Sequence, residues 1–148
     1  MAVRDNPFGA FNFTVDLGDG VDGVAAGFAE VTGLSTEITY ADYRNGNDKV
    51  SNVRRIPTLA STGDVVLKRG VVGDRRLFDW LTAVRDGTPS PRTVTISLLD
   101  EAREVVATWR LTNAQPRKWV GPTLVAKGGG DVAMEELHLT ADRIDFES

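Results

Sequence analysis

The segment VVLKRGVVGDRRLFDW, residues 65–80, has the outline of a phosphate-binding site. An apolar run ends in Lys68 and Arg69, two glycines follow in a GxxG pattern at residues 70–73, and apolar residues then recur at helical spacing. A P-loop requires GxxxxGK[ST], and a dinucleotide-binding turn requires GxGxxG. The chain contains no Gly-Lys dipeptide, and this segment has only the shorter glycine pattern. The segment is therefore interpreted as a strand-to-helix corner, with Asp74 as the helix N-cap.

Acid–base catalysis has one histidine available, His138, which stands between two leucines in an alternating segment. It shares its predicted strand face with Glu136, an arrangement typical of a solvated or interfacial pair. The neighbouring Glu135 points to the opposite face, because successive residues of a strand alternate. There is no cysteine and no GxSxG nucleophile elbow. The sequence therefore predicts no catalytic residues, and the protein is not expected to be an enzyme.

A metal site is suggested only by the acidic stretch DLGDGVDG, which begins at Asp16. An EF-hand loop needs an acid at its twelfth position and a glycine at its sixth. Counted from Asp16, the twelfth residue is Gly27; counted from Asp19, the third and sixth residues are valines. Neither register fits, so the stretch is interpreted as a turn. We expect no metal and no cofactor.

Alternation of apolar and polar residues is the main structural signal in the chain. It predicts strands in FNFTVDL, TEITYADY, VVLKRG, RTVTISLLD, EVVATWRLTN and the final region DVAMEELHLTADRIDF. The first strand and the segment VAAGFAEVTGL are predicted to form a hairpin around GDGVDG, and the short link DEAR predicts a second hairpin. Helical spacing predicts one helix over about 74–86, ended by Gly87. The expected fold is mainly β: an antiparallel β-sandwich or barrel with one α-helix, in a single domain over 1–148.

The periodic pattern disappears between residues 44 and 64, RNGNDKVSNVRRIPTLASTGD. A long extended loop is predicted there. Loops of this length are uncommon in compact domains and are usually functional or disordered. The loop is locally basic through Lys49, Arg54 and Arg55, whereas the whole chain is acidic.

Composition excludes several classes of function. The 148 residues carry a formal net charge of -4 with a pI near 5.0. This balance argues against sequence-independent nucleic-acid binding, which requires clustered cations. No apolar run approaches the roughly 20 residues of a membrane span, so no stable membrane anchor is expected. No signal-peptide pattern is visible at the N-terminus, so folding in the cytoplasm is expected.

Several motifs, taken together, indicate one protein family. Three arginine-containing motifs occur in order, YRxG, RxxP and LKRG, and WRLTNAQPRKWVGP follows at residues 109–122. With NPFGAFNFTVDLGD and LFDWL, they resemble the tail tube protein family over about residues 6–142. These proteins are the inner tube subunits of contractile phage tails and of phage-tail-like contractile injection systems. The chain departs from the usual family wording at Arg54-Arg55, where a lysine is common, and at Thr58, where a glycine is frequent.

The resemblance implies a small β-sandwich or barrel-like domain with a helix. Six copies are then expected to close into a ring whose strands complete a β-barrel channel, and rings stack into a hollow tube. A contractile sheath drives this tube through the target envelope and so delivers DNA or protein cargo, without sequence-specific binding in the lumen. The implied partners are further copies of the chain, the sheath protein, and baseplate and tube-terminating proteins. The implied location is a virion tail or a contractile injection particle, after assembly in the bacterial cytoplasm.

The resemblance also suggests site residues. The extended loop and the LKRG motif are predicted to contact the neighbouring subunit or ring, where cations meet acidic partners. These interface candidates are Tyr43, Arg44, Gly46, Lys49, Arg54, Arg55, Pro57, Lys68, Arg69 and Gly70. The hydroxyl-rich face formed by Thr93, Thr95 and Ser97 is predicted to line the channel.

Two alternatives stay open at this point. A baseplate or tube-initiating paralogue of the same fold would share these motifs. A small β-barrel ligand-binding protein or hydrolase would need a convergent polar pocket, for which one histidine and no cysteine offer little material.

Overall fold

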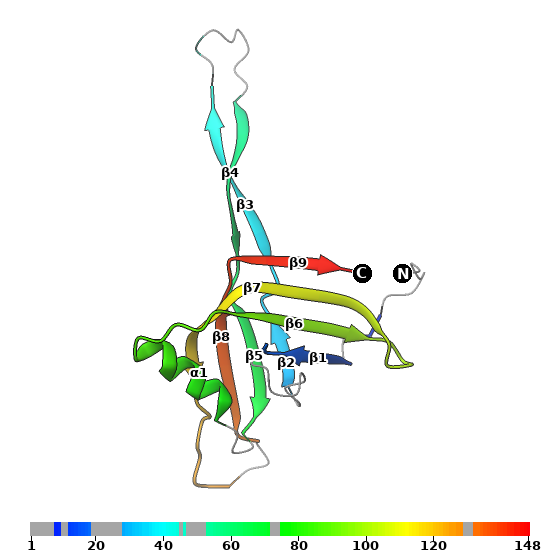
Figure 1. Cartoon of the computed structure of the whole chain (residues 1–148), viewed down its shortest axis with the longest axis vertical. Helices are drawn as coiled ribbons and strands as arrows, with labels where there is room; N and C mark the ends of the chain where they lie inside the picture. Colours follow the sequence, from blue (N-terminus) through cyan, green and yellow to red (C-terminus); the bar gives the residue numbers. More distant parts are fainter. Residues whose placement is uncertain are drawn as a thin grey trace.

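The computed structural model describes residues 8–9, 12–18, 28–44, 46, 53–71, 75–128 and 132–148. Within them, one helix, α1 (Arg76–Arg85), accompanies the strands β1 to β9. The strands are β1 (Phe13–Asp16), β2 (Phe28–Thr32), β3 (Thr36–Tyr43), β4 (Arg54–Thr62), β5 (Val65–Gly70), β6 (Arg92–Leu99), β7 (Val105–Val120), β8 (Met134–Thr140) and β9 (Arg143–Glu147). The predicted mainly β, antiparallel fold with one helix is confirmed (Figure 1).

Two four-stranded antiparallel sheets form the body and share the long strand β7. The first sheet has the order β1-β6-β7-β9, and the second has the order β7-β8-β5-β2. The strand passes from one sheet to the other near Asn113, whose φ of 53° lies in the left-handed region. The amide nitrogen Nδ2 of Asn113 donates to Oδ2 of Asp142 over 2.9 Å, at the bend between β8 and β9. The Asp142 amide also donates to the Thr112 carbonyl over 3.0 Å, so two hydrogen bonds join β7 to this bend.

The core lies between the two sheets and is closed at one end by α1. Val94 and Ile96 of β6 and Leu67 of β5 are at most 2% exposed, as the alternation of their strands predicts. The helix contributes Leu77 and Trp80, the latter anchored by its Nε1 donating to the Ser90 carbonyl over 2.9 Å. Burying side chains of this size stabilises the fold by about 1.5–3 kcal/mol each.

The helix agrees closely with its predicted range. It begins at Arg76, with Arg75 in the N-cap position; the predicted N-cap, Asp74, lies outside the described residues. It ends where predicted, because Gly87 adopts φ 94° directly after the C-cap residue Asp86.

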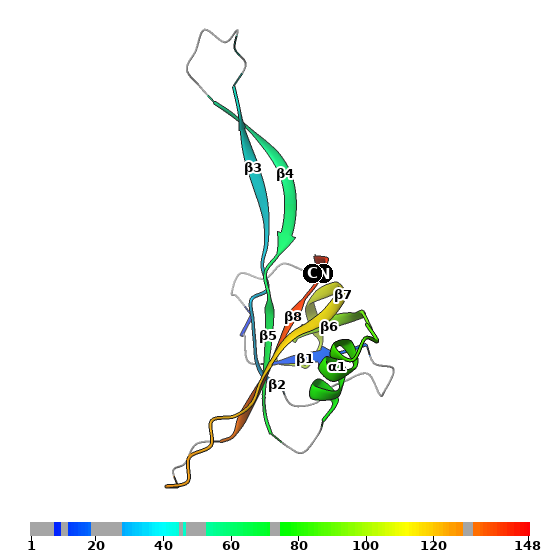
Figure 2. The ribbon, with the colours of Figure 1, turned by 90° about the vertical axis from the view of Figure 1, so that its left-hand side faces the viewer.

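Two sequence-based expectations about connections are wrong. The first strand does not form a hairpin with the next: β1 pairs with β6, and β2 pairs with β5. The segment 44–64 is not an irregular loop throughout, because Arg54–Thr62 forms β4, which pairs with β3. These two strands make an arm that projects away from the body, and Figures 1 and 2 show it from two sides. We call β3 and β4 together the arm.

Candidate assembly surfaces

The arm holds most of the predicted interface residues. Tyr43 stands opposite Arg54 in the β3–β4 register, and Pro57 stands opposite Tyr40. Arg55 forms an exposed ion pair with Asp42, with Nε 3.9 Å from Oδ1. Arg44 and Gly46 follow the end of β3, and Lys49 lies outside the described residues. The structure thus brings this part of the predicted set together on one projecting element.

The arm is unusual because its apolar side chains are exposed. Tyr40 and Ile38 on β3 are 54% and 53% exposed, and Leu59 on β4 is 72% exposed. Every residue of β3 is exposed, and so is every residue of β4 except Thr62. Several large apolar side chains exposed on one element in this way indicate an interaction site. The sequence pattern indicated the basic residues of this element but not its apolar ones.

Lys68 lies on the outer face of the second sheet, away from the arm. Its Nζ is 3.2 Å from Oε1 of Glu136 and 3.4 Å from Oε2 of Glu30. The hydrogen bond from Lys68, and next the one from His138, lower the pKa of Glu136 below its ordinary value of 4.5. The hydrogen bond and the charge of Glu136 raise the pKa of Lys68 above 10.5. The predicted pair of Glu136 and His138 is present, with Nε2 of His138 3.2 Å from Oε2 of Glu136.

Arg69 does not lie on the surface, which differs from its predicted role. It is 2% exposed, and its Nε donates to Oε1 of Glu135 over 2.6 Å. Trp119 donates from Nε1 to the other carboxylate oxygen of Glu135 over 3.1 Å, and the guanidinium lies 5.7 Å from the centre of the Phe28 ring. Neighbouring strand residues point to opposite faces, so only one of the two LKRG cations can reach solvent. In the single subunit, Arg69 therefore stabilises the body rather than presenting a charge to a neighbour.

Gly70 ends β5 opposite Met134. A Cβ added there would lie 3.7 Å from the nearest atom, in the Val132 side chain, which is an ordinary contact. The position therefore has room for a Cβ.

Thr93, Thr95 and Ser97 lie on the outer face of the first sheet. Thr95 aligns with Arg110 of β7 and, through it, with Asp145 of β9. Ser97 aligns in the same way with Thr108 and Glu147. Because directly opposite residues share a face, this face is polar across the sheet.

The cations of this polar face are paired with acids of the same face. Arg110 forms an ion pair with Glu147, and Arg143 donates from Nε to Oδ1 of Asp145 over 2.8 Å. Sequence reasoning missed these residues, although the alternation of WRLTN could have placed Arg110 beside the predicted hydroxyls. The two outer strands of this sheet, β1 and β9, each pair with one strand among the described residues.

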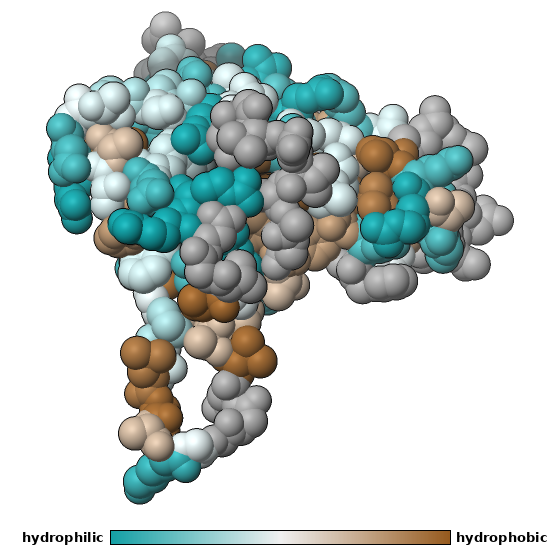
Figure 3. All heavy atoms as spheres, turned by 60° about the horizontal axis from the view of Figure 1, so that its bottom comes forward, coloured by the Kyte–Doolittle hydropathy of each residue, from teal (hydrophilic) through white to brown (hydrophobic). Residues whose placement is uncertain are grey.

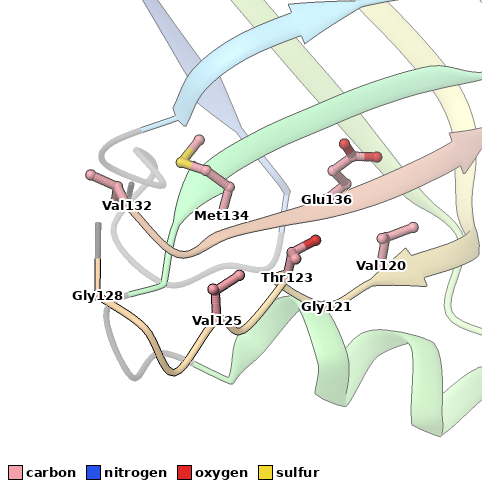
Figure 4. A pocket seen from close by; sticks show the side chains of 8 residues that line it. All are labelled: Val120, Gly121, Thr123, Val125, Gly128, Val132, Met134 and Glu136. Atoms are coloured by element: carbon pink, nitrogen blue, oxygen red, sulfur yellow. The ribbon is translucent and has the colours of Figure 1, made fainter. Parts of the chain in front are cut away.

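A second exposed apolar surface lies at the end of the body opposite the arm, between β7 and β8. Leu124, Val125 and Val132 are 81%, 67% and 72% exposed. Figure 3 brings this end forward and shows hydrophobic atoms along the projecting loop. An open pocket of about 580 Å³ lies beside it, with Met134 and Glu136 among its lining side chains (Figure 4). No periodic pattern in the sequence indicates this surface.

Among the described residues, no group of three or more His, Cys, Asp or Glu side chains is placed to hold a metal ion. In the same part of the chain, the helix is too short and too polar to cross a membrane.

Comparison with known proteins defines the family. The model of the T4-like virus tail tube protein gp19 family matches residues 9–145. The match extends over nearly the whole chain, so the protein belongs to this family and is a structural component of the tail tube type. No curated protein sequence matches the chain.

Solved structures agree with this assignment. A chain of the PVC sheath–tube complex in its extended state, from an extracellular contractile injection system, is 29% identical; the alignment covers 97% of this chain and 93% of that one, with a TM-score of 0.84. A chain of the PVC sheath/tube terminator in its extended state is 30% identical, with coverages of 99% and 100% and a TM-score of 0.84. A chain of the anti-feeding prophage baseplate is 25% identical, with both coverages at 97% and a TM-score of 0.81.

Proposed function

We propose that this chain is the inner tube subunit of a contractile phage tail or of a phage-tail-like contractile injection particle. Six copies close into a ring, and rings stack into a hollow tube inside a sheath. The observation that carries this proposal is the arm, whose apolar residues, such as Tyr40 and Leu59, face solvent in the single subunit. A two-stranded ribbon is marginally stable by itself. Contact with another subunit would bury these side chains and stabilise the ribbon.

The first sheet is the proposed wall of the channel. Its outer strands, β1 and β9, can pair with those of neighbouring copies, and a closed barrel removes strand edges that would otherwise attract other chains. Thr93, Thr95 and Ser97 then face the lumen as hydroxyl groups. The cations of the same face are held by acids, as in the Arg143–Asp145 pair. Such a wall suits the passage of DNA or protein cargo without sequence-specific binding.

The proposed partners are the sheath, the baseplate and tube-terminating proteins, in addition to further copies of the chain. The support is the similarity to chains from complexes whose printed descriptions name a sheath–tube complex, a terminator and a baseplate. When the sheath contracts, the tube is driven through the target envelope. We assign the subunit no catalytic role and no cofactor, and we place its assembly in the bacterial cytoplasm.

Electron microscopy of the purified protein and of its native particle tests the proposal. We expect rings with six-fold symmetry in end view and stacked rings in side view. The chain should also be one of the most abundant components of the particle, because a tube contains many rings whereas an initiator is present in one. A monodisperse monomer at high concentration, together with a particle that holds only one ring of this chain, would contradict the proposal.

A further inference from the structure

The arm joins the body through a junction that contains two glycines. The strand β2 leads into β3 through residues 33–35, and β4 leads into β5 through Gly63 and Asp64. The Gly63 amide donates to the Ser35 carbonyl over 3.1 Å, which links the two sides of the junction. At Gly33 the backbone adopts a φ of +85°. Glycines inside a strand weaken it and mark bends, so this junction is the place where the ribbon turns most easily.

Two side chains brace the junction against the body. Thr62, the last residue of β4, donates from Oγ1 to the Ala141 carbonyl over 2.6 Å. Thr62 is half-buried, whereas every other residue of β4 is exposed. Asp64 forms an ion pair with Arg117 of β7. Both contacts connect the base of the arm to residues far along the chain, 79 and 53 positions away.

The bend that accepts the Thr62 hydroxyl is itself fixed. Ala141 lies between β8 and β9, next to Asp142, which is hydrogen-bonded to Thr112 and Asn113 of β7. The strand β9 belongs to the first sheet and is in contact with β4. Figure 1 shows β4, β7 and the start of β9 meeting at this corner. The base of the arm is thereby connected to the first sheet, the proposed wall of the channel.

We propose that Thr62 and Asp64 are positioning residues, which hold the arm in one direction relative to the first sheet in the free subunit. The inference rests on the proposed function and deepens it, because it names the contacts that aim the arm before assembly. At about 3.3 Å per residue the nine residues of β4 span roughly 30 Å, so a tilt of about 10° at the base moves the far end by roughly 5 Å. This displacement is about one strand spacing, which is enough to misplace the arm against another subunit.

The two braces are suited to setting a direction, because each is weak compared with the core. A neutral hydrogen bond and a solvent-exposed ion pair contribute modestly to the stability of a fold. A change of the size of one hydrogen bond in the balance between two arm directions alters their ratio by about two- to ten-fold. Removing a brace therefore changes the direction of the arm in a body that stays folded.

Distances between two spin labels test the inference in the free subunit. The chain has no cysteine, so labels are attached through Leu59→Cys in the middle of β4 and Arg85→Cys at the exposed end of α1. Electron–electron double resonance then gives the distribution of distances between the labels. We expect one narrow peak in this labelled chain. Thr62→Val, which removes the hydroxyl at nearly constant shape, should broaden the peak, and adding Arg117→Met should broaden it further.

Matched variants separate positioning from a general loss of stability. Thr58→Val makes the same chemical change within the arm, where Oγ1 donates to the Thr39 carbonyl over 2.7 Å, and it should leave the peak narrow. Thr62→Ser keeps a hydroxyl and should restore the narrow peak. Urea unfolding of each variant shows that the body is folded under the conditions of the distance measurement. The distances report the main population, whereas hydrogen exchange responds to rare opening of the ladder.

Tube assembly shows whether the direction of the arm matters. For unlabelled Thr62→Val we expect the critical concentration for tubes to rise by about two- to ten-fold, because the competent direction is less populated. Thr58→Val should assemble like the wild type. A broad distribution in the labelled chain without brace variants, or an unchanged one after Thr62→Val with Arg117→Met, overturns the inference and leaves the tube function intact.

Two further outcomes keep the proposals distinguishable. A broadened distribution with an unchanged critical concentration shows that the direction of the arm does not limit assembly, which also overturns the positioning role. A wild-type chain that forms no rings or tubes overturns the proposed function, and the inference that the arm is aimed for assembly fails with it. The spin-label distances still decide in that case whether Thr62 and Asp64 fix the arm.

Discussion

Arg69 and Glu135 form an ion pair inside the body, with Nε 2.6 Å from Oε1 and exposures of 2% and 5%. Their strands, β5 and β8, place them directly opposite each other. Trp119 satisfies the second carboxylate oxygen, so the pair is hydrogen-bonded as well as charged. The pair therefore connects two strands of the second sheet with the Trp119 ring, which also contacts Phe78 of the helix.

Removing one partner of this pair should destabilise the subunit strongly. Arg69→Met leaves a carboxylate buried without its cation, and we expect a loss of about 3–5 kcal/mol in the free energy of unfolding. The double variant Arg69→Met, Glu135→Leu should recover much of that loss, because no charge is left buried. Urea unfolding measures both. The matched control is Arg75→Met, which breaks an exposed pair with Asp79 and should cost less than about 1 kcal/mol.

A strand can be predicted from the sequence where one of its faces is buried, because burial makes apolar and polar residues alternate. Val94 and Ile96 alternate with hydroxyl residues, so β6 and its hairpin with β7 are visible in the sequence. In the arm, β3 alternates and is predicted as a strand, whereas β4 has no buried face and no period, so a loop is predicted in its place. The partner of β1 is β6, some 80 residues away, and turn-rich residues after β1 wrongly favoured a local hairpin.

The candidate site was predictable to a similar degree. The basic motifs indicated Arg54 and Arg55, which do lie on the projecting arm. The same motifs do not show that Lys68 reaches solvent whereas Arg69 is buried. The burial of Arg69 depends on Glu135, 66 residues further along the chain. Exposure of Leu124 and its neighbours depends on how β7 and β8 are joined, which no local pattern records.

Gly33 marks the base of the arm, and its replacement should be costly. Its φ is +85°, and an added Cβ would lie 2.0 Å from the Asp64 carbonyl oxygen. Gly33→Ala therefore adds a clash with backbone to the strain of a left-handed conformation, and we expect a loss of about 2–3 kcal/mol. Gly87→Ala is the control, because its φ is +94° but nothing lies within 4 Å. Equal thermal stabilities of the two variants would refute the steric explanation.

The Lys68–Glu136 contact makes a definite prediction about pH. Because the pKa of Glu136 is lowered in the folded state, its stabilisation is present above the unfolded pKa and is lost as pH falls through the folded value, below 4.5. The pKa of Lys68 is raised, so its stabilisation is present below the unfolded pKa and is lost only above 10.5. This contact should therefore contribute a constant amount between these limits.

Carbon-13 NMR titration of the Glu136 carboxyl checks the cause of the shift. Lys68→Met removes its largest source, so the pKa of Glu136 should rise toward its ordinary value. Lys127→Met, on the loop between β7 and β8, changes the net charge equally and should leave that pKa in place. An unchanged titration of Glu136 in Lys68→Met would show that the ion pair does not form in solution.

Hydrogen exchange should distinguish the arm in the free subunit from the arm in the tube. The ladder between β3 and β4 is exposed on both sides, so its amides should exchange fast in the unassembled chain. Burial between neighbours should slow them by a large factor. The amides of β6, which lie over the core, provide the internal control and should be protected in both states. Mass spectrometry of matched peptides gives the comparison, and equal arm protection in both states would count against arm burial on assembly.

Charge reversal on the arm should block stacking without unfolding the subunit. Arg54→Glu with Arg55→Glu replaces two exposed cations by acids, so an arm predicted to meet acidic partners is now repelled by them. We expect folded protein with a wild-type urea midpoint, because surface changes of this kind alter stability by about 0.5 kcal/mol or less. Negative-stain images should show at most single rings. The control, Arg75→Glu with Arg85→Glu, makes the same change in net charge at the exposed ends of α1 and should assemble normally. If the arm variant forms tubes of ordinary length, the cations at residues 54 and 55 do not contribute to the contact between rings.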